Sequence, residues 1–401
     1  MKRHKSFPTR VFWLLVAAAV VALAHRPESA GETQRRPGNA NRQARWPEAG
    51  ACTVQSLTRG DGLKAYSHDG SSFVVNKEDE NGTAQMYLGR DGQPGLTCIT
   101  CEERPGGPKR ERFKMQPRWH PSGKWLFMAV ERDKFSPPPI LGWSRKFVEG
   151  QLQNGLFTNM WAMTIDGMHW YRLSDFKSGV RNMPDGFTGP AFTPDGTQAI
   201  WSQIVDGNVF RYSPFGRWEL ILADVQVKDG APSYANLRNI TPRGMHWNEP
   251  GDFSPDGVSF VLTGSTEKDA QGQDIYILNI KTGKLTNLTN SPTVWDEHGV
   301  FSPDGEKIVM MSAYPYRSDP NASKIFGIKT EFMLMNKDGS NLMQLTRFRE
   351  RGSPEYTEAI AATPQWSHDG RSLSLAALMF PDYEFYELTF RGPCGRTGRR
   401  F

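Results

Sequence analysis

The pentapeptide FSPDG occupies Phe253–Gly257 and recurs unchanged at Phe301–Gly305. Four more stretches fit a looser pattern of an aromatic residue, two variable residues, Asp or Ser, and Gly: YSHDG from Tyr66, WHPSG from Trp119, FTPDG from Phe192 and WSHDG from Trp366. Proline at the second turn position, a carboxylate that bonds local backbone and a left-handed Gly are typical of tight turns between antiparallel strands. The sequence therefore repeats one hairpin turn six times.

Strand-like segments follow these turns. KWLFMAV, TQAIWSQ, VSFVLTG, EKIVMMS and RSLSLAAL are rich in β-branched, aromatic and long apolar residues. Several are apolar at adjacent positions, which indicates strands covered on both faces. Third and fourth strand phrases such as DIYILNI and TNLTN lie downstream, so the repeating unit has four strands. Radial repetition of such sheets predicts an all-β fold, a six-bladed β-propeller of four-stranded antiparallel blades.

The last blade lacks a fourth strand in its own segment of the chain. The spare strand-like segment TVQSLT, Thr53–Thr58, carries the same closing LT phrase as the other blades, and we expect it to pair antiparallel with Glu384–Phe390 and close the ring. That pairing would bring Cys52 close to Cys394. Cys98 and Cys101 form a C-x-x-C without a haem-attachment His or a second such pair. We therefore predict two disulfides, Cys52–Cys394 and Cys98–Cys101.

The N-terminus resembles an export signal. Four basic residues within the first ten positions precede an apolar run, Phe12–Ala24, that ends in small residues. We predict a signal peptide at 1–24, a disordered linker at 25–52, the propeller at 53–392 and a tail at 393–401. Thirteen apolar residues are short for a membrane span, and an uncleaved anchor is the alternative. We expect a periplasmic or secreted protein without a transmembrane span after cleavage.

Charge argues against a nucleic-acid partner. The whole chain carries a formal net charge of +5, and removal of Lys2, Arg3, Lys5 and Arg10 with the signal peptide leaves about +1. The basic character of the sequence is thus largely that of its export signal.

The repeated F-S-P-D-G turn, the I-Y-I-L-N strand and the closing L-T phrase resemble the TolB-type propeller repeat over Val54–Arg391. Similar repeats occur in TolB proteins, in propeller domains of prolyl-oligopeptidase-like peptidases and in oligogalacturonate lyases. The peptidase G-x-S-x-G motif is absent from this sequence, as are H-x-H or Q-x-x-H groupings of the kind that hold the metal in the lyases. The resemblance therefore implies a fold more strongly than an activity.

Two blade-to-blade loops share a second phrase, HWNEPGDFSPDG and WDEHGVFSPDG, in which Trp lies nine and Glu seven residues before the turn Asp. Carboxylates beside histidines can bind a cation or act as acid and base, and indoles can stack on a sugar or a peptide side chain. Alternatively, Glu caps backbone amides and Trp fills the funnel wall. We expect solvated carboxylates here. The predicted ligand-binding residues of the central funnel are Arg181, His246, Trp247, Glu249, Trp295, Asp296, Glu297, His298, Glu355 and Tyr356.

Strand order places the six turns on one face and the longest insertions on the other. Those insertions are Glu131–Thr158, Ile204–Arg217, Ala313–Thr330 and the blade-to-blade loop Phe348–Thr363. The first is rich in apolar residues and either packs on the rim or acts as a lid or docking element. Because binding usually resides in long loops on a rigid face, we predict a binding scaffold for an envelope or extracellular protein, peptide or glycan.

Two other functions remain open. One is a polysaccharide lyase-like or metal-dependent enzyme that uses the funnel carboxylates and histidines, and the other is a structural component of the envelope. The sequence identifies neither a cofactor nor a metal.

Overall fold

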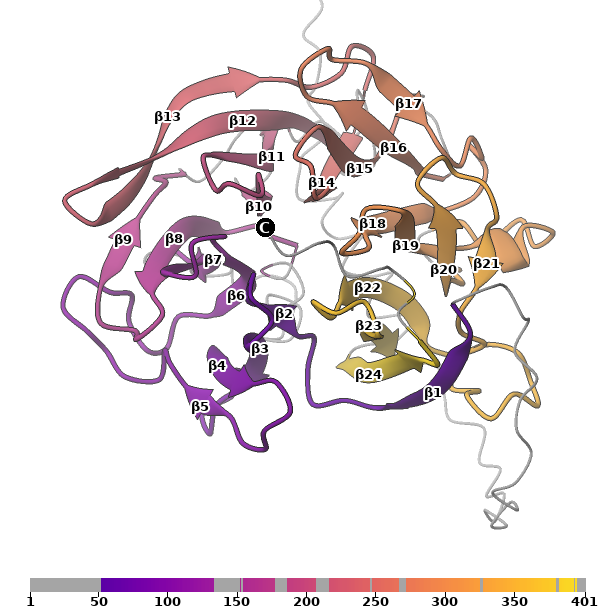
Figure 1. Ribbon diagram of the computed structural model, residues 1–401, viewed down its shortest axis with the longest axis horizontal. Coiled ribbons are helices and arrows are strands. Elements are labelled where there is room, and N and C mark those ends of the chain that lie inside the picture. Colours follow the sequence, from indigo (N-terminus) through magenta and orange to yellow (C-terminus); the bar gives the residue numbers. More distant parts are fainter. Residues whose placement is uncertain are drawn as a thin grey trace, which may run out of the picture.

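The computed structural model describes residues 52–132, 152, 154–176, 186–206, 216–245, 247–266, 272–324, 327–379, 382–392 and 394. The predicted signal peptide and nearly all of the predicted linker lie outside these residues. Six four-stranded antiparallel sheets stand around a common axis, as Figure 1 shows. The predicted six-bladed β-propeller is confirmed.

Each blade is named here by its order in the chain, and its strands are given from the axis outward. Blade 1 consists of β2 (Ala65–Tyr66), β3 (Ser72–Glu78), β4 (Ala84–Arg90) and β5 (Thr97–Cys98). Blade 2 consists of β6 (Lys114–Trp119), β7 (Trp125–Glu131), β8 (Thr158–Thr164) and β9 (Trp170–Arg172). Blade 3 consists of β10 (Phe187–Phe192), β11 (Gln198–Asp206), β12 (Arg217–Lys228) and β13 (Ala231–Asn239).

The second half of the ring follows the same order. Blade 4 consists of β14 (Trp247–Phe253), β15 (Ser259–Ser265), β16 (Asp274–Asn279) and β17 (Leu285–Asn287). Blade 5 consists of β18 (Asp296–Phe301), β19 (Lys307–Ser312), β20 (Glu331–Asn336) and β21 (Met343–Gln344). Blade 6 consists of β22 (Ile360–Trp366), β23 (Ser372–Met379), β24 (Asp382–Phe390) and β1 (Val54–Arg59).

The repeated pentapeptide joins the first two strands of a blade, as predicted. In blade 4, the Ser254 hydroxyl donates to Asp256 Oδ1 at 2.6 Å, and the Val258 amide donates to the same oxygen at 3.0 Å. Gly257 has a φ of 69°, a left-handed conformation that favours glycine. Ser, Asp and Gly therefore each have a defined role in closing the hairpin.

The turn glycines also let neighbouring blades approach. A Cβ added to Gly305 of blade 5 would lie 2.9 Å from Cδ of Pro255 in blade 4. The same contact closes the ring, because a Cβ on Gly70 of blade 1 would lie 2.6 Å from Cβ of His368 in blade 6. At these turns the Pro or His of one blade packs where the Gly of the next blade has no side chain.

The core lies between the blades. All seven residues of β7 are buried, as expected for a strand covered on both faces. Between blades 4 and 5, for example, Val261 and Ile275 pack with Phe301, Ile308 and Met333. Each sheet therefore buries both faces only because the ring places a neighbour on either side.

The N-terminal strand closes the ring. β1 pairs antiparallel with β24, with Val54 opposite Phe390, and lies on the outside of blade 6 in Figure 1. Cys52 and Cys394 form a disulfide with their Cα atoms 4.5 Å apart, and Cys98 is bonded to Cys101. The predicted closing strand and both predicted disulfides are confirmed.

The short, similar turn sequences predicted a regular turn face, but the face is less regular in the structure. β12 and β13 in blade 3 are longer than the outer strands of the other blades, and their hairpin carries Tyr234 and Val225 against the core between blades 2 and 3. Apolar residues of this hairpin therefore cover a neighbouring blade.

The long insertion Glu131–Thr158 lies mostly outside the described residues. At its C-terminal end, Leu152 is fully buried and packs in the core of blades 2 and 3, while Leu156 packs with Trp218 and Trp247. This end of the insertion forms part of the rim, which was one of its two predicted roles. Among the described residues, the structure contains no helix with the length and apolarity needed to cross a bilayer.

Candidate functional site

Three side chains that the sequence predicted to be neighbours meet near the axis of the ring. Glu249 projects from β14 of blade 4, and Glu297 and His298 project from β18 of blade 5. One ligand atom from each lies within 4.8 Å of the other two. We call Glu249, Glu297 and His298 the axial cluster.

His298 connects three blades. Its Nε2 lies 3.3 Å from Oε2 of Glu249 in blade 4, and its Nδ1 lies 2.9 Å from the carbonyl oxygen of Ala362 in blade 6. Because a carbonyl only accepts, Nδ1 carries a proton and directs Nε2 toward the carboxylate. The backbone amide of His298 also donates to Thr263 Oγ1 at 3.0 Å. The imidazole therefore has a fixed orientation.

The two carboxyl groups of the axial cluster have different environments. Burial, together with the negative charge of Glu249, raises the pKa of Glu297 to about 7, against the opposing effect of His298. Burial also acts to raise the pKa of Glu249, but the positive charge of His298, a hydrogen bond from His298 and the charge of Arg118 lower it overall. At pH 6 Glu249 is ionised and Glu297 is mostly neutral.

The imidazole of His298 is held as a cation. Burial acts to lower its pKa, but the charges of Glu249 and Glu297 outweigh burial and raise the pKa to about 10. The Glu297 carboxyl also accepts a hydrogen bond from Trp295 Nε1 at 2.8 Å. Glu297 is only 9% exposed and Glu249 is ion-paired, so the expectation of solvated carboxylates was wrong. Sequence spacing placed these residues correctly but could not show what packs around them.

Local backbone geometry brings the cluster together. The pairing of β18 with β19 shifts register between Glu297 and Val300, and His298 has a φ of 57°, which is uncommon for a non-glycine residue. Such a bulge redirects a side chain. A Cβ on Gly251 would lie 2.3 Å from the carbonyl oxygen of Gly299, so β14 and β18 approach at a distance that only glycine permits.

The sequence patterns did not point to three further ionisable residues that lie near the cluster. Arg118 of β6 interacts electrostatically with Asp252 and Glu249, and burial lowers the pKa of its guanidinium. Burial raises the pKa of Asp252 to about 6. Burial also raises the pKa of Tyr383 on β24, with smaller effects from Glu297 and Glu249. Arg118 lies four residues before Ser122, and Asp252 lies four residues before Asp256, which are equivalent positions in their turns. An alignment of the repeats could therefore have shown that Arg118 and Asp252 occupy equivalent positions.

Three other predicted residues are part of the protein interior. Trp247 and Trp295 are each only 7% exposed, which leaves little indole surface for a ligand. Asp296 is buried and accepts hydrogen bonds from the hydroxyls of Ser291 and Ser312, and burial raises its pKa to about 6. These positions match the alternative in which the tryptophans fill the wall. Arg181 and His246 lie outside the described residues.

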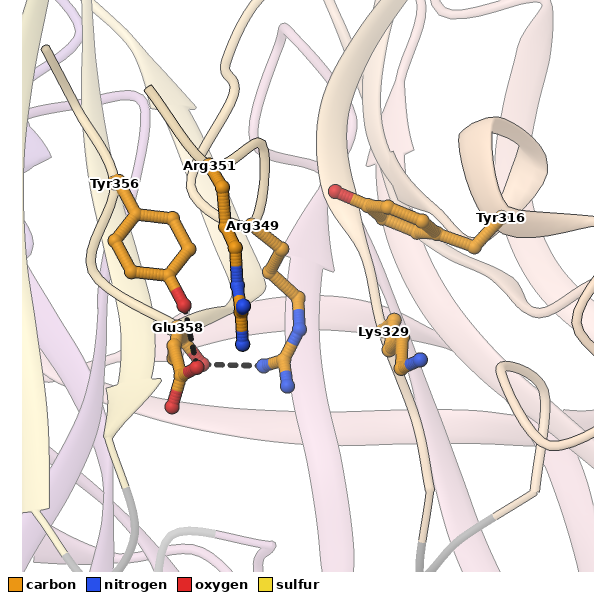
Figure 2. Close-up of a pocket in the computed structure, with 6 residues that line it drawn as sticks. All are labelled: Tyr316, Lys329, Arg349, Arg351, Tyr356 and Glu358. Atoms are coloured by element: carbon orange, nitrogen blue, oxygen red, sulfur yellow. Dashed lines mark hydrogen bonds between the residues drawn. The ribbon is translucent and has the colours of Figure 1, made fainter. Parts of the chain in front are cut away.

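The last two predicted residues belong to a different part of the loop-rich face. Glu355 accepts a hydrogen bond from the Arg347 amide at 3.0 Å, and burial raises its pKa to about 7. Tyr356 is 38% exposed and lines a cavity of about 180 Å³. This cavity, shown in Figure 2, is lined by Tyr316, Lys329, Arg349, Arg351, Tyr356 and Glu358. We call it the loop pocket.

A buried carboxylate holds both walls of the loop pocket. Glu331, at the start of β20, accepts hydrogen bonds from the Tyr316 hydroxyl on one side and from the Phe348 and Arg349 amides on the other. Tyr316 belongs to the 3₁₀ turn η1 (Tyr314–Tyr316) in the β19–β20 insertion, and Arg349 lies in the loop between blades 5 and 6. Two insertions predicted to share a face therefore meet in one cavity.

Comparisons with known proteins give a likeness of fold. No protein-family model and no curated protein sequence matches the chain. It is similar to a TolB-type protein from Agrobacterium tumefaciens, with a TM-score of 0.45 and 17% identity over 71% of this chain and 74% of that one. It is also similar to TolB from Acinetobacter baumannii, with a TM-score of 0.47 and 13% identity over 85% of this chain and 65% of that one.

A solved oligogalacturonate lyase in complex with manganese is similar to the same degree, with a TM-score of 0.46 and 13% identity over 83% of this chain and 90% of that one. Likenesses at such identities concern the fold alone. With its repeated turn, its six four-stranded blades and its ring closed by β1, the chain is a six-bladed β-propeller.

Proposed function

We propose that this protein is an exported scaffold that binds a protein, peptide or glycan of the envelope or extracellular space through its loop-rich face and funnel. The observation that carries the proposal is the loop pocket, which the β19–β20 insertion of blade 5 and the loop between blades 5 and 6 form together. A rigid propeller that presents long loops on one face is a common arrangement for binding.

Export is the second part of the proposal. Its support is the basic and apolar N-terminal sequence together with two disulfides, which persist in oxidising compartments. Fusion of residues 1–52 to a reporter enzyme that is active only after export tests it directly. Activity from this fusion, and none from a fusion that begins at residue 25, is the expected result. A reporter that stays inactive in both fusions would contradict export.

Peptide and glycan arrays test the binding function. The native protein should bind a restricted set of compounds, and Tyr356→Ala in the loop pocket should weaken that binding. Arg371→Ala is the control, because Arg371 follows the turn of blade 6 on the opposite face and its side chain is 62% exposed. Equal losses in both variants, or no bound compound on either array, would contradict a scaffold that uses the loop-rich face.

A metal-dependent enzyme is the second candidate function, and the axial cluster favours it. Glu249, Glu297 and His298 offer three ligand atoms within 4.8 Å of one another. The Nδ1 of His298 donates to a backbone carbonyl, an arrangement that commonly orients a metal-binding imidazole. Metal binding would require His298 to release its Nε2 proton. A bound divalent cation would then supply Lewis-acid chemistry there, while Trp295 would hold Glu297 in place.

Metal analysis separates this candidate from the scaffold. The purified protein would be dialysed against zinc or manganese, and the bound metal compared with that of Glu249→Gln. One equivalent of metal in the native protein and none in the variant would support the enzyme. No retained metal at micromolar concentration would contradict it.

A further inference from the structure

The loop pocket has more positive than negative charge. Its lining contains Lys329, Arg349 and Arg351 but a single carboxylate, Glu358. Lys329 is paired with Asp319 at 2.6 Å, whereas neither arginine has an acidic partner within the part of the chain that the structure describes. Figure 2 shows both arginines among the side chains that line the pocket. Two like charges that line one pocket repel, and an anion bound there would be attracted to both.

Arg349 is held by groups that do not neutralise its charge. The guanidinium of Arg349 donates to the backbone carbonyl of Glu358, which does not neutralise its charge. The carboxylate of Glu358 accepts a hydrogen bond from the Tyr356 hydroxyl. Glu331 also accepts a hydrogen bond from the Arg349 amide, so Arg349 is positioned before any ligand arrives. Preorganisation of this kind reduces the entropic cost of binding.

The two insertions that form the pocket also carry side chains of the types that dominate protein–protein contacts. Tyr314 and Tyr356 are among the few large apolar or aromatic residues that the described part of the ring exposes, at 39% and 38%. Arg317 lies over the ring of Tyr314 at 4.2 Å. Tyr and Arg are enriched among residues that contribute most to binding energy at protein interfaces. A protein or peptide partner fits this surface better than a small inorganic anion does.

We propose that the loop pocket binds a carboxylate side chain of an acidic peptide segment in a partner protein. In this arrangement Arg351 and Arg349 hold the carboxylate, and Tyr316 and Tyr356 pack against the flanking peptide. Guanidinium groups suit this role because their planar donors match the two oxygens of a carboxylate. The proposal rests on the proposed scaffold function and specifies its partner.

Fluorescence anisotropy with defined probes tests the inference. The probe is a fluorescein-labelled octaglutamate, and octaglutamine and a galacturonate hexamer serve as comparison ligands. Octaglutamate should bind, more weakly as salt rises, and octaglutamine should not. Arg351→Glu should weaken octaglutamate binding about tenfold or more, equivalent to about 1.4 kcal/mol. Arg371→Glu makes the same charge change on the opposite face and should leave the affinity within about twofold, because exposed charges interact weakly over distance.

A second, more conservative variant distinguishes loss of the binding group from a local loss of structure. Arg349→Lys keeps the positive charge but removes the guanidinium, and it should weaken binding by a smaller factor than Arg351→Glu. Equal losses from Arg351→Glu and Arg371→Glu would show only general charge attraction and would overturn the inference. Binding of the galacturonate hexamer without octaglutamate would also overturn it, yet would support the scaffold. Failure of all probes would overturn the inference, while the arrays test the scaffold separately.

Discussion

Glu249 and Glu297 occupy equivalent positions in consecutive blades and yet have different charges at mildly acidic pH. Glu249 lies against the His298 imidazolium, whereas Glu297 is more buried and has the negative charge of Glu249 beside it. Repetition in the sequence predicted the shared position. It could not predict the difference, which comes from His298 standing in the second blade where Pro250 stands in the first.

Substitution with glutamine should separate the two carboxyl groups. At pH 6, Glu297→Gln should change the free energy of unfolding by less than about 1 kcal/mol, because a neutral amide replaces a mostly neutral carboxyl group and still accepts from Trp295. Glu249→Gln should cost about 3 kcal/mol, because it leaves His298 without its ion-pair partner. Urea unfolding measures both. Equal costs, or a larger cost for Glu297→Gln, would contradict the assigned charges.

The axial cluster also predicts how stability depends on pH. The pKa of Glu297 rises from 4.5 to about 7 on folding and that of His298 from 6.5 to about 10, so the folded state binds more protons in both ranges. The free energy of unfolding should therefore fall as pH rises from about 5 to 8, by up to about 1.4 kcal/mol per pH unit for each proton. The raised pKa values of Asp252 and Glu355 act in the same direction.

His298→Gln isolates one part of this dependence. Between pH 7 and 8 the variant should lose less stability than the native protein, because its position 298 no longer releases a proton on unfolding. Buried Lys114, whose pKa is lowered to about 8, acts in the opposite direction above that range. Thermal melts in matched buffers provide the comparison. A native protein that becomes more stable from pH 5 to 8, or parallel profiles for the two proteins, would rule out a protonated His298.

Among the elements, the hairpin turns were the most predictable. Their Ser, Pro, Asp and Gly act through local backbone geometry, which the sequence contains in full. The packing of Gly305 on Pro255 was not predictable in this way, because it depends on how two blades meet. The length of the β12–β13 hairpin was missed for the same reason.

Two alanine substitutions measure this contact between turns. Gly123 and Gly305 have nearly the same φ, 70° and 72°, but a Cβ on Gly123 would meet nothing within 4 Å. Gly123→Ala should cost about 1 to 2 kcal/mol for the left-handed conformation alone. Gly305→Ala should cost more, because its Cβ would also press on Pro255. A Gly305→Ala variant at least as stable as Gly123→Ala would show that the interlocking turns do not contribute.

The closing strand gives a prediction about the two disulfides. Cys52–Cys394 joins residues 342 apart and ties β1 to blade 6, whereas Cys98–Cys101 spans three. In the chain-entropy account, paired serine substitutions should cost about 6 kcal/mol for the first disulfide and about 2 kcal/mol for the second. Denaturant unfolding of the two double variants checks this order. A larger loss at Cys98–Cys101 would contradict closure of the ring through β1.

For the whole molecule, the sequence predicted the ring, its closure and the division into a turn face and a loop-rich face. These properties follow from strand order and repetition. The sequence pointed to single loop-pocket residues such as Tyr356, but it did not predict the pocket. Its walls come from two separate insertions that buried Glu331 links by hydrogen bonds, and no local sequence pattern predicts that these insertions meet.

Hydrogen–deuterium exchange with and without the tightest-binding compound from the arrays tests the central claim, that the loop-rich face binds. Bound ligand should slow exchange in residues 314–324 and 347–358, and leave the turns at Ser254–Gly257 and Ser302–Gly305 unchanged, because ordering by a ligand is local to its contacts. Slower exchange at those turns, with no change around the loop pocket, would place binding on the opposite face and contradict the account.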